Sequence, residues 1–204
     1  LRFRRGRRVI FDGVDLVNGG VTQAELDILN NGLFPLTAGE THTFLVQDPG
    51  GTPRTVTLVS ANLAPKPVNR TKVIDTPGGK VAYILFNTFS PFASEKDIAE
   101  AISAMQAAGV NDLVLDLRYN GGGLLAVASQ LGYMVAGPSR TSGRVFERLR
   151  FNAAAGSRNP VTGAFNEPIP FLSTGVGFSL PSGAPLANLN LPRVFVLTTD
   201  WTCS

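Results

Sequence analysis

The stretch LVLDLRYNGGGLLAVA, residues 113–128, constrains the fold more than any other part of this chain. An apolar strand carries Asp116 and Arg118, runs into Asn120 and three glycines, and is followed by a helical pattern. Glycines adopt backbone conformations that other residues avoid. At a strand-to-helix turn they can leave N–H groups exposed beside the positive end of the helix dipole. Such a turn can bind phosphate or stabilise an oxyanion, although a purely structural tight turn explains the glycines equally well.

The segments around this turn predict an α/β fold. Residues 80–89 and 112–117 are continuous apolar runs typical of buried strands, and residues 94–109 and 124–137 have helical periodicity. Strands that alternate with helices indicate right-handed βαβ units and a mainly parallel sheet covered on both faces. Residues 138–192 are rich in Gly, Pro, Ser and Asn and predict a long functional cover. The run RVFVLTTD that follows predicts another core strand.

The first part of the chain predicts a separate β-rich module at residues 1–63. An Asp12-Gly13 turn joins two short strands, Thr22 and Glu25 have capping-box spacing before a helix that Gly32 ends, and residues 42–60 form a hairpin pattern. Residues 64–72 carry two prolines and few large apolar groups, which indicates a linker. We therefore expect the second domain to occupy residues 73–204.

Composition excludes several classes of site and location. Cys203 and His42 are the only cysteine and histidine, so an internal disulfide and metal sites built from Cys or several His are not possible. We expect no metal and no cofactor. No apolar run approaches the roughly 18 residues that span a bilayer, and the first residues lack the apolar segment of a signal peptide.

The net charge of +3 comes from arginines near the start of the sequence. Such a cluster can form a nucleic-acid patch, or it can be a solvated edge. No recognised nucleic-acid motif accompanies it. We therefore expect no nucleic-acid partner.

A possible nucleophile follows the last predicted strand, in the stretch TTDWTCS that ends in Ser204. Sites in α/β folds lie at the carboxyl ends of strands, so Ser204 would face the glycines if the two strands are neighbours. His42 lies in the first module, so the base for Ser204 would be a lysine with a lowered pKa. Cys203 is either a redox-sensitive thiol or, as we favour, a small apolar group.

These residues resemble the C-terminal processing peptidases, also called tail-specific proteases, which are related to the tricorn core. The resemblance rests on GGKVAYILFNTFS, on the Asp-Leu-Arg-x-Asn-x-Gly-Gly pattern at residues 116–123, and on RVFVLTTDWTCS. It implies an α/β fold with a crotonase-like ββα core. Residues 1–63 resemble the later part of that family's PDZ domain, although its carboxylate-binding loop would precede Leu1 and Gly6-Arg7 replaces the usual Gly-Asp.

The resemblance also implies roles for single residues. Ser204 would be the nucleophile of a Ser–Lys dyad, and Gly121 and Gly122 would form the oxyanion hole. The residues expected to form the scaffold of the site are Asp116, Arg118, Asn120 and Gly123. The family's lysine follows the serine motif, whereas the lysines of this chain, Lys66, Lys72, Lys80 and Lys96, all precede it. We therefore expect this fragment to be inactive by itself.

By resemblance, the activity is that of a serine endopeptidase that cleaves proteins near their C-terminal tails in the periplasm or outside the cell. Its partner is the C-terminus of a protein or peptide substrate. The alternative is a non-catalytic protein that binds peptides or apolar ligands on the same fold, and a downstream sequence without lysine would favour it. The sequence does not predict the oligomeric state.

Overall fold

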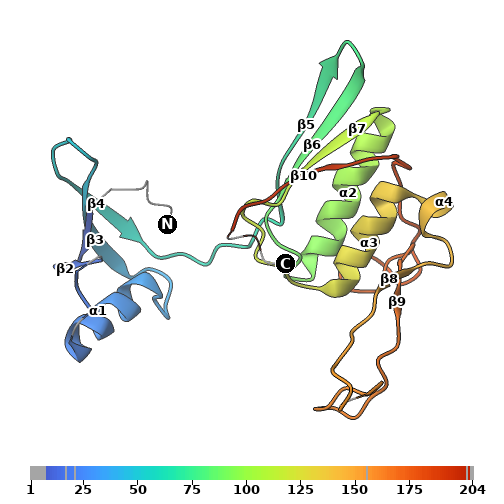
Figure 1. The fold of residues 1–204 in the computed structure, drawn as a ribbon. Coiled ribbons are helices and arrows are strands. Elements are labelled where there is room, and N and C mark those ends of the chain that lie inside the picture. Colours follow the sequence, from blue (N-terminus) through green and yellow to red (C-terminus); the bar gives the residue numbers. More distant parts are fainter. Residues whose placement is uncertain (1–7, 17, 21, 155, 201, 203–204) are drawn as a thin grey trace. The chain divides into compact units, whose positions relative to one another are not determined.

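The computed structural model describes residues 8–16, 18–20, 22–154, 156–200 and 202. The chain divides into two compact units, Leu1–Ala64 and Pro65–Ser204, which are considered separately (Figure 1). Within the described residues, none of the helices combines the length and the apolar character needed to cross a membrane.

The first unit is a four-stranded antiparallel sheet in the order β2-β1-β3-β4, with one helix. Its elements are β1 (Arg8–Phe11), β2 (Val14–Asp15), α1 (Gln23–Leu33), β3 (Thr41–Gln47) and β4 (Arg54–Val59). The predicted Asp12-Gly13 turn is confirmed, since both residues have positive φ angles, 42° and 90°. The predicted hairpin is confirmed by the pairing of β3 with β4.

Helix α1 begins as the sequence predicts but ends differently. The Glu25 N–H donates to the Thr22 side chain, and the Glu25 carboxylate accepts from the Thr22 N–H at 3.1 Å, which completes the capping box. Gly32 does not stop the helix, which continues to Leu33. A Cβ at Gly32 would overlap the ring of Phe11, so the glycine instead lets the helix pack closely against the small core.

The second unit contains a four-stranded sheet in the order β10-β7-β6-β5 (Figure 1). Its elements are β5 (Val68–Thr76), β6 (Gly79–Phe86), α2 (Ala93–Ala107), β7 (Asp112–Asp116), α3 (Leu125–Ala136), α4 (Pro138–Thr141), β8 (Val145–Glu147), β9 (Ile169–Pro170) and β10 (Phe195–Leu197). Strands β6, β7 and β10 are parallel, as predicted, but β5 runs antiparallel to β6 and makes the sheet mixed.

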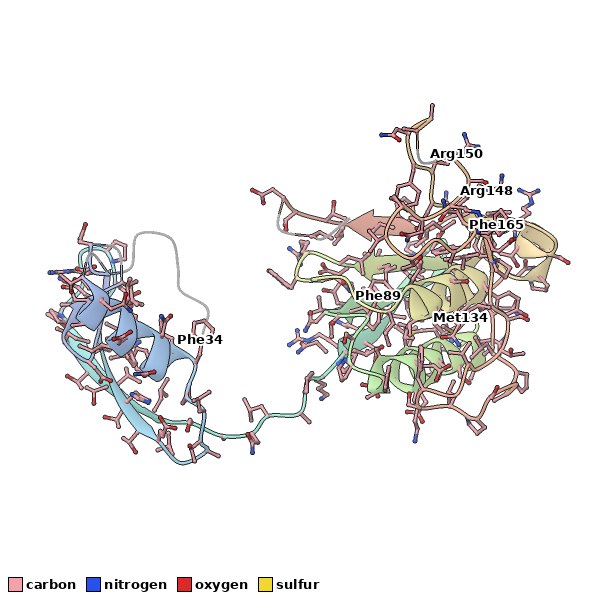
Figure 2. All side chains as sticks on the ribbon, turned by 90° about the horizontal axis from the view of Figure 1, so that it is seen from below. Phe34, Phe89, Met134, Arg148, Arg150 and Phe165 are labelled. Atoms are coloured by element: carbon pink, nitrogen blue, oxygen red, sulfur yellow. The ribbon has the colours of Figure 1, made fainter. Side chains whose placement is uncertain are left out.

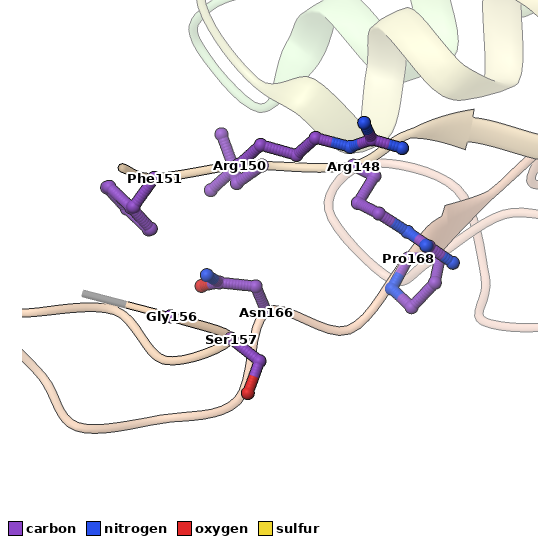
Figure 3. A pocket seen from close by; sticks show the side chains of 8 residues that line it. Arg148, Arg150, Phe151, Gly156, Ser157, Asn166 and Pro168 are labelled. Atoms are coloured by element: carbon purple, nitrogen blue, oxygen red, sulfur yellow. The ribbon is translucent and has the colours of Figure 1, made fainter. Parts of the chain in front are cut away.

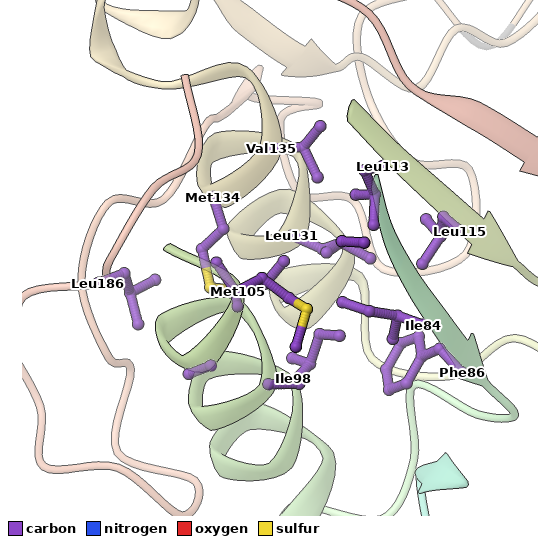
Figure 4. Packing of buried hydrophobic residues seen from close by; sticks show 14 of the residues in the cluster. Ile84, Phe86, Ile98, Met105, Leu113, Leu115, Leu131, Met134, Val135 and Leu186 are labelled. Carbon is purple, nitrogen blue, oxygen red and sulfur yellow. The ribbon is translucent and has the colours of Figure 1, made fainter. Parts of the chain in front are cut away.

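The main core lies between one face of this sheet and helices α2 and α3 (Figure 4). Ala82, Ile84 and Phe86 of β6 point into it and are fully buried, whereas the alternate residues Tyr83 and Leu85 on the other face are only partly buried. The prediction that helices cover both faces is therefore wrong for the described residues. A continuous apolar run makes both faces of a strand apolar, so the sequence does not tell which face the helices cover. Here α2 and α3 both pack on the same face of the sheet (Figure 1).

The predicted linker at residues 64–72 is too long, because β5 begins at Val68. Four consecutive polar residues, Asn69 to Lys72, follow Val68, so the start of the strand has no apolar pattern in the sequence. Pairing with β6 from Val68–Phe86 to Thr76–Gly79 nevertheless holds the segment in an extended conformation. The two prolines precede the strand, at residues 65 and 67.

Strand β10 is a strand as predicted, but it is not buried. Phe195 is 50% exposed and Val196 is 47% exposed. The reason is position: β10 pairs with β7 at the edge of the sheet, and the neighbours that would make it a central strand are not among the described residues.

Candidate active site

Asp116, the last residue of β7, is fully buried and is held by two other polar side chains. Its carboxylate accepts hydrogen bonds from the Tyr83 hydroxyl at 2.7 Å, from Arg118 Nε at 3.0 Å and from Arg118 Nη2 at 2.7 Å. The Arg118 hydrogen bonds, together with that of Tyr83, lower the pKa of Asp116 to about 2, although burial raises it. The carboxylate is therefore ionised and fully engaged, which suits a structural role better than proton transfer.

Tyr83 was not identified in the sequence as part of this cluster. It lies on β6, on the face of the sheet opposite the helices, and its hydrogen bond to Asp116 raises the pKa of its phenol. The backbone N–H of Arg118 also donates to Asp116 at 3.1 Å, so the carboxylate fixes the first residues after the strand as well. The sequence signal was weak, since Tyr83 lies in a continuous apolar run and the sequence does not specify which group its hydroxyl contacts.

Asn120 connects the glycine turn to the sheet. Its side chain is almost fully buried, and its Nδ2 donates to the carbonyl oxygen of Phe86 at 3.0 Å. Its Oδ1 accepts the N–H of Gly122 at 2.8 Å. The Gly122 N–H is therefore already engaged. In the described part of the chain no hydrogen bond uses the Gly121 N–H, and a Cβ at Gly121 would meet no atom within 4 Å.

Gly123 is required by close packing. Its φ is 141°, and an added Cβ would lie 2.5 Å from the carbonyl carbon of Phe89 and 2.6 Å from the nitrogen of Ser90. The Phe89 N–H donates to the Gly122 carbonyl at 2.9 Å, and the Leu124 N–H donates to the Phe89 carbonyl at 3.1 Å. Hydrogen bonds and close packing therefore hold the glycine turn against Phe89 and Ser90, in the segment that follows β6.

The turn after β10 is fastened to the same end of the sheet. β10 and β7 are parallel neighbours, which meets the condition that the sequence left open, and Leu197 lies opposite Asp116. The Thr202 hydroxyl donates to the Leu117 carbonyl at 2.8 Å, and the Thr199 hydroxyl donates to the Arg118 carbonyl at 3.0 Å. Sequence reasoning missed both threonines. The predicted nucleophile Ser204 and its neighbour Cys203 lie outside the described residues.

The four lysines lie elsewhere in the second unit. Lys80 Nζ donates to the Ala108 carbonyl at 3.1 Å, and Lys96 Nζ pairs with Glu100 at 3.7 Å. Lys72 lies in β5, and Lys66 is exposed in the segment before it. In the described residues none of the four has a hydrogen bond or ion pair with the glycine turn.

Glu95 is a second buried carboxylate that the sequence did not reveal. It accepts hydrogen bonds from Gln130 Nε2 at 2.8 Å and from four backbone N–H groups of the segment 176–180, at 2.7–3.1 Å. Burial raises the pKa of Glu95, but the Gln130 and backbone donors outweigh it and hold the pKa below its usual value. Glu95 thereby ties the long segment after β9 to the start of α2.

This chain is similar in sequence and in fold to known proteins. Residues 80–175 match the model of Peptidase family S41. A carboxyl-terminal-processing protease of Picosynechococcus sp. is 33% identical over 121 residues, which are 59% of this chain and 27% of that protein. A putative S41 protease structure from Bacteroides fragilis covers 98% of this chain and 49% of its own, with 27% identity and a TM-score of 0.57.

A further structure, a photosystem II D1 C-terminal processing protease, is similar in fold. It covers 98% of this chain and 46% of its own, with a TM-score of 0.51 and 19% identity. The chain thus spans between about a quarter and a half of the length of these relatives. The sequence matches agree with the family that the sequence motifs indicated, and the last structure adds a similar fold. The family match begins at residue 80, so the PDZ-like module at residues 1–63 stays a prediction.

Proposed function

Since the second unit carries a domain of peptidase family S41, at residues 80–175, we propose that this chain is part of a serine endopeptidase that processes protein C-termini. Two of the relatives are named C-terminal processing proteases, and the third is named a putative S41 protease. Because the chain spans only part of their length, the proposal concerns the longer protein in which this sequence works. The fragment supplies the nucleophile and the oxyanion turn of the proposed site.

The observation that carries the proposal is the attachment of the Thr199–Thr202 turn to the end of β7. The hydrogen bonds of Thr202 and Thr199 to the carbonyls of Leu117 and Arg118 hold the end of the described chain beside the start of the glycine turn. Ser204 follows Thr202 by two residues. This arrangement supports Ser204 as the nucleophile of a site at the carboxyl edge of a parallel sheet.

In the proposed reaction, Ser204 Oγ attacks the carbonyl carbon of a substrate peptide bond. Its proton passes to the neutral amine of a lysine that lies beyond this chain, and the lysine then protonates the departing amine. Water, deprotonated by the same lysine, then attacks the acyl-enzyme ester; the new C-terminus is released, and the lysine returns the proton to Ser204 Oγ. Without that lysine, the fragment is inactive by itself.

The developing oxyanion would accept a hydrogen bond from the Gly121 N–H, which has no partner among the described residues. Gly122 can join only if Asn120 releases its N–H, since that group donates to Asn120 Oδ1. Asp116, Arg118, Asn120 and Gly123 act as the scaffold that fixes this turn. The hydrogen bonds of Arg118 to Asp116, the burial of Asp116 and Asn120, and the bond from Asn120 to the Phe86 carbonyl support that role.

The remaining assignments follow from the same family. We propose that the second unit, Pro65–Ser204, is the first part of the catalytic domain on a crotonase-like core, and that residues 1–63 form part of a PDZ-like module for the substrate's C-terminal carboxylate. We also propose a periplasmic or extracellular location. The role of the module can be tested by deleting residues 1–63 from the longer protein, and we expect the deletion to abolish binding of the peptide's C-terminus.

The test of the catalytic proposal is hydrolysis of a peptide with an apolar C-terminal tail by the longer protein. We expect Ser204→Ala to lower kcat by at least about a thousandfold, because the nucleophile is lost. Cys203→Ala is the matched neighbour and should retain most of the activity. Equal turnover by Ser204→Ala and the parent would contradict the nucleophile assignment. Binding without turnover by the parent would favour the non-catalytic alternative.

A further inference from the structure

Residues 148–168 leave the second unit as an arm whose base is closed by the pairing of β8 with β9 (Figure 1). The arm has its own hydrogen-bonded tip. Asn159 Oδ1 accepts the N–H groups of Val161 and Thr162 at 2.9 and 3.1 Å, and Arg158 forms a bridge with Phe165. The Arg158 guanidinium also lies 3.7 Å from the centroid of the Phe165 ring. The arm is therefore an ordered projection, built without a large core of its own.

A cavity of about 400 Å³ lies within the arm (Figure 3). Its lining residues are Arg148, Leu149, Arg150, Phe151, Gly156, Ser157, Asn166 and Pro168. In Figure 3 the side chains of Arg148, Arg150 and Phe151 come from one segment that follows β8, and those of Ser157 and Asn166 come from the facing segments. The cavity is thus a trough between residues 148–151 and the segments that face them.

Arg148 and Arg150 differ from Arg118, Arg158 and Arg193 in having no hydrogen-bond or ion-pair partner among the described residues. Arg118 and Arg193 are each paired with an aspartate, and Arg158 donates to the Gly163 carbonyl. Arg148 and Arg150 are exposed, and no hydrogen bond or ion pair to either is present among the described residues. Both guanidinium groups therefore keep their donor forks available, and a guanidinium fork matches a carboxylate in geometry and charge.

Apolar side chains accompany these charges. Leu149 is 51% exposed, Phe151 is 39% exposed, and Val161 at the tip is 91% exposed. The hydroxyl of Ser157 and the amide of Asn166 add groups that can bond to a peptide backbone. The acidic residues nearest in sequence, Glu147 and Glu167, lie at the base of the arm rather than in the lining of the cavity. The trough is thus positively charged with an apolar rim.

We propose that this trough binds an extended acidic segment of a protein partner, with its carboxylates on Arg148 and Arg150 and its apolar side chains on Leu149 and Phe151. In Figure 2 these arginines lie on one side of the second unit, and Phe89, which contacts the glycine turn, lies apart from them. The site goes beyond the proposed peptidase reaction, because binding here requires neither the nucleophile nor its base. It would hold a substrate at a point separate from the bond that is cut.

The test measures binding of a fluorescent peptide of alternating Glu and Leu to the 204-residue chain by fluorescence anisotropy. A peptide with Gln in place of every Glu is the matched ligand. We expect the acidic peptide to bind at least about tenfold more tightly than the Gln peptide, and its affinity to fall as salt rises. The double variant Arg148→Gln/Arg150→Gln should lose at least about tenfold in affinity.

The matched control is Arg70→Gln/Arg144→Gln, which removes the same charge from exposed arginines of the second unit outside the trough. It should bind the acidic peptide nearly as well as the parent, and circular dichroism should show the same fold for both double variants. Equal losses in the two double variants would overturn the site, as would equal binding of the two peptides or no binding. Tighter binding of a single-stranded oligonucleotide through Arg148 and Arg150 would also overturn the peptide assignment. Ser204→Ala should leave binding unchanged, so this test is independent of the catalytic one.

Discussion

The glycine turn at residues 120–123 and the arm at residues 148–168 are both rich in glycine and asparagine, yet different contacts stabilise them. In the turn, Asn120 is buried and bonds to the carbonyl of Phe86, on another strand. In the arm, Asn159 bonds to its own loop, at Val161 and Thr162. The glycine turn is thus held by a hydrogen bond to a strand of the sheet, whereas the tip of the arm is held by hydrogen bonds within its own loop. A turn that must hold an oxyanion needs the first kind of support, whereas a docking trough can use the second.

Replacing one glycine by alanine in each loop should give the largest difference in stability between the two regions. Gly123→Ala should destabilise the second unit by about 3 kcal/mol or more, because φ is 141° and the Cβ would overlap Phe89 and Ser90. Gly163→Ala also has a positive φ, 71°, but would meet no atom within 4 Å, so we expect a loss of about 1 kcal/mol. Urea unfolding followed by circular dichroism measures both. Similar losses would mean that the two loops are not supported differently.

Removal of a charged group from each region should give the next largest difference. Asp116→Ala leaves Arg118 and Tyr83 without their shared acceptor inside the sheet, and we expect a loss of about 3 kcal/mol. Arg158→Ala removes an exposed contact with Phe165 in the arm and should cost less than about 1 kcal/mol. The same unfolding measurement checks both, and a larger cost for Arg158→Ala would reverse the comparison.

Acid should weaken the end of β7 through Asp116. Its pKa falls from 3.8 to about 2 in the folded chain, so the ionised form is stabilised by folding. The contribution is complete above about pH 4 and is lost as the pH falls through about 2, and its size is about 2 kcal/mol. Asp116→Asn should be less stable than the parent at neutral pH and should lose less stability between pH 4 and pH 2. A parallel decline in parent and variant would show that another group is responsible.

The smallest effect is expected at Gly121. A Cβ there would meet no atom within 4 Å, and its φ is not in the positive range, so Gly121→Ala should change stability by less than about 0.5 kcal/mol. The contrast with Gly123→Ala, two residues away, would separate the open part of the turn from its packed part. A large loss of stability in Gly121→Ala would mean that this open space is filled in solution.

The sequence predicted the parts of the fold whose signals are local. The apolar run of β7, the glycines and the helix after them, and the capping box of α1 all lie within short windows, and all are present. It failed at β5, where polar residues such as Arg70 and Lys72 resemble a linker, and it predicted the strand β10 correctly but not its exposure. In both cases position in the sheet, which depends on distant residues, decided the outcome.

The candidate site follows the same rule. The motif residues Asp116 and Asn120 could be named from the sequence, but their partners could not. Tyr83 is 33 residues from Asp116, and Thr202 is 85 residues from Leu117. The engagement of the Gly122 N–H depends on the orientation of the Asn120 amide, which no sequence pattern specifies. Family resemblance supplied the expected roles, and the hydrogen bonds show which glycine still has a free donor among the described residues.

The central proposal is that the turn after β10 places Ser204 where it can attack a peptide carbonyl whose oxygen accepts a hydrogen bond from the Gly121 N–H. The most direct measurement is a crystal structure of the longer protein with a peptide boronic acid, which forms a tetrahedral adduct with a nucleophilic serine. We expect a covalent bond from boron to Ser204 Oγ and a boronate oxygen about 2.7–3.1 Å from the Gly121 nitrogen. A boronate bonded to another residue, or a Ser204 adduct whose oxygen lies away from Gly121, would contradict the account.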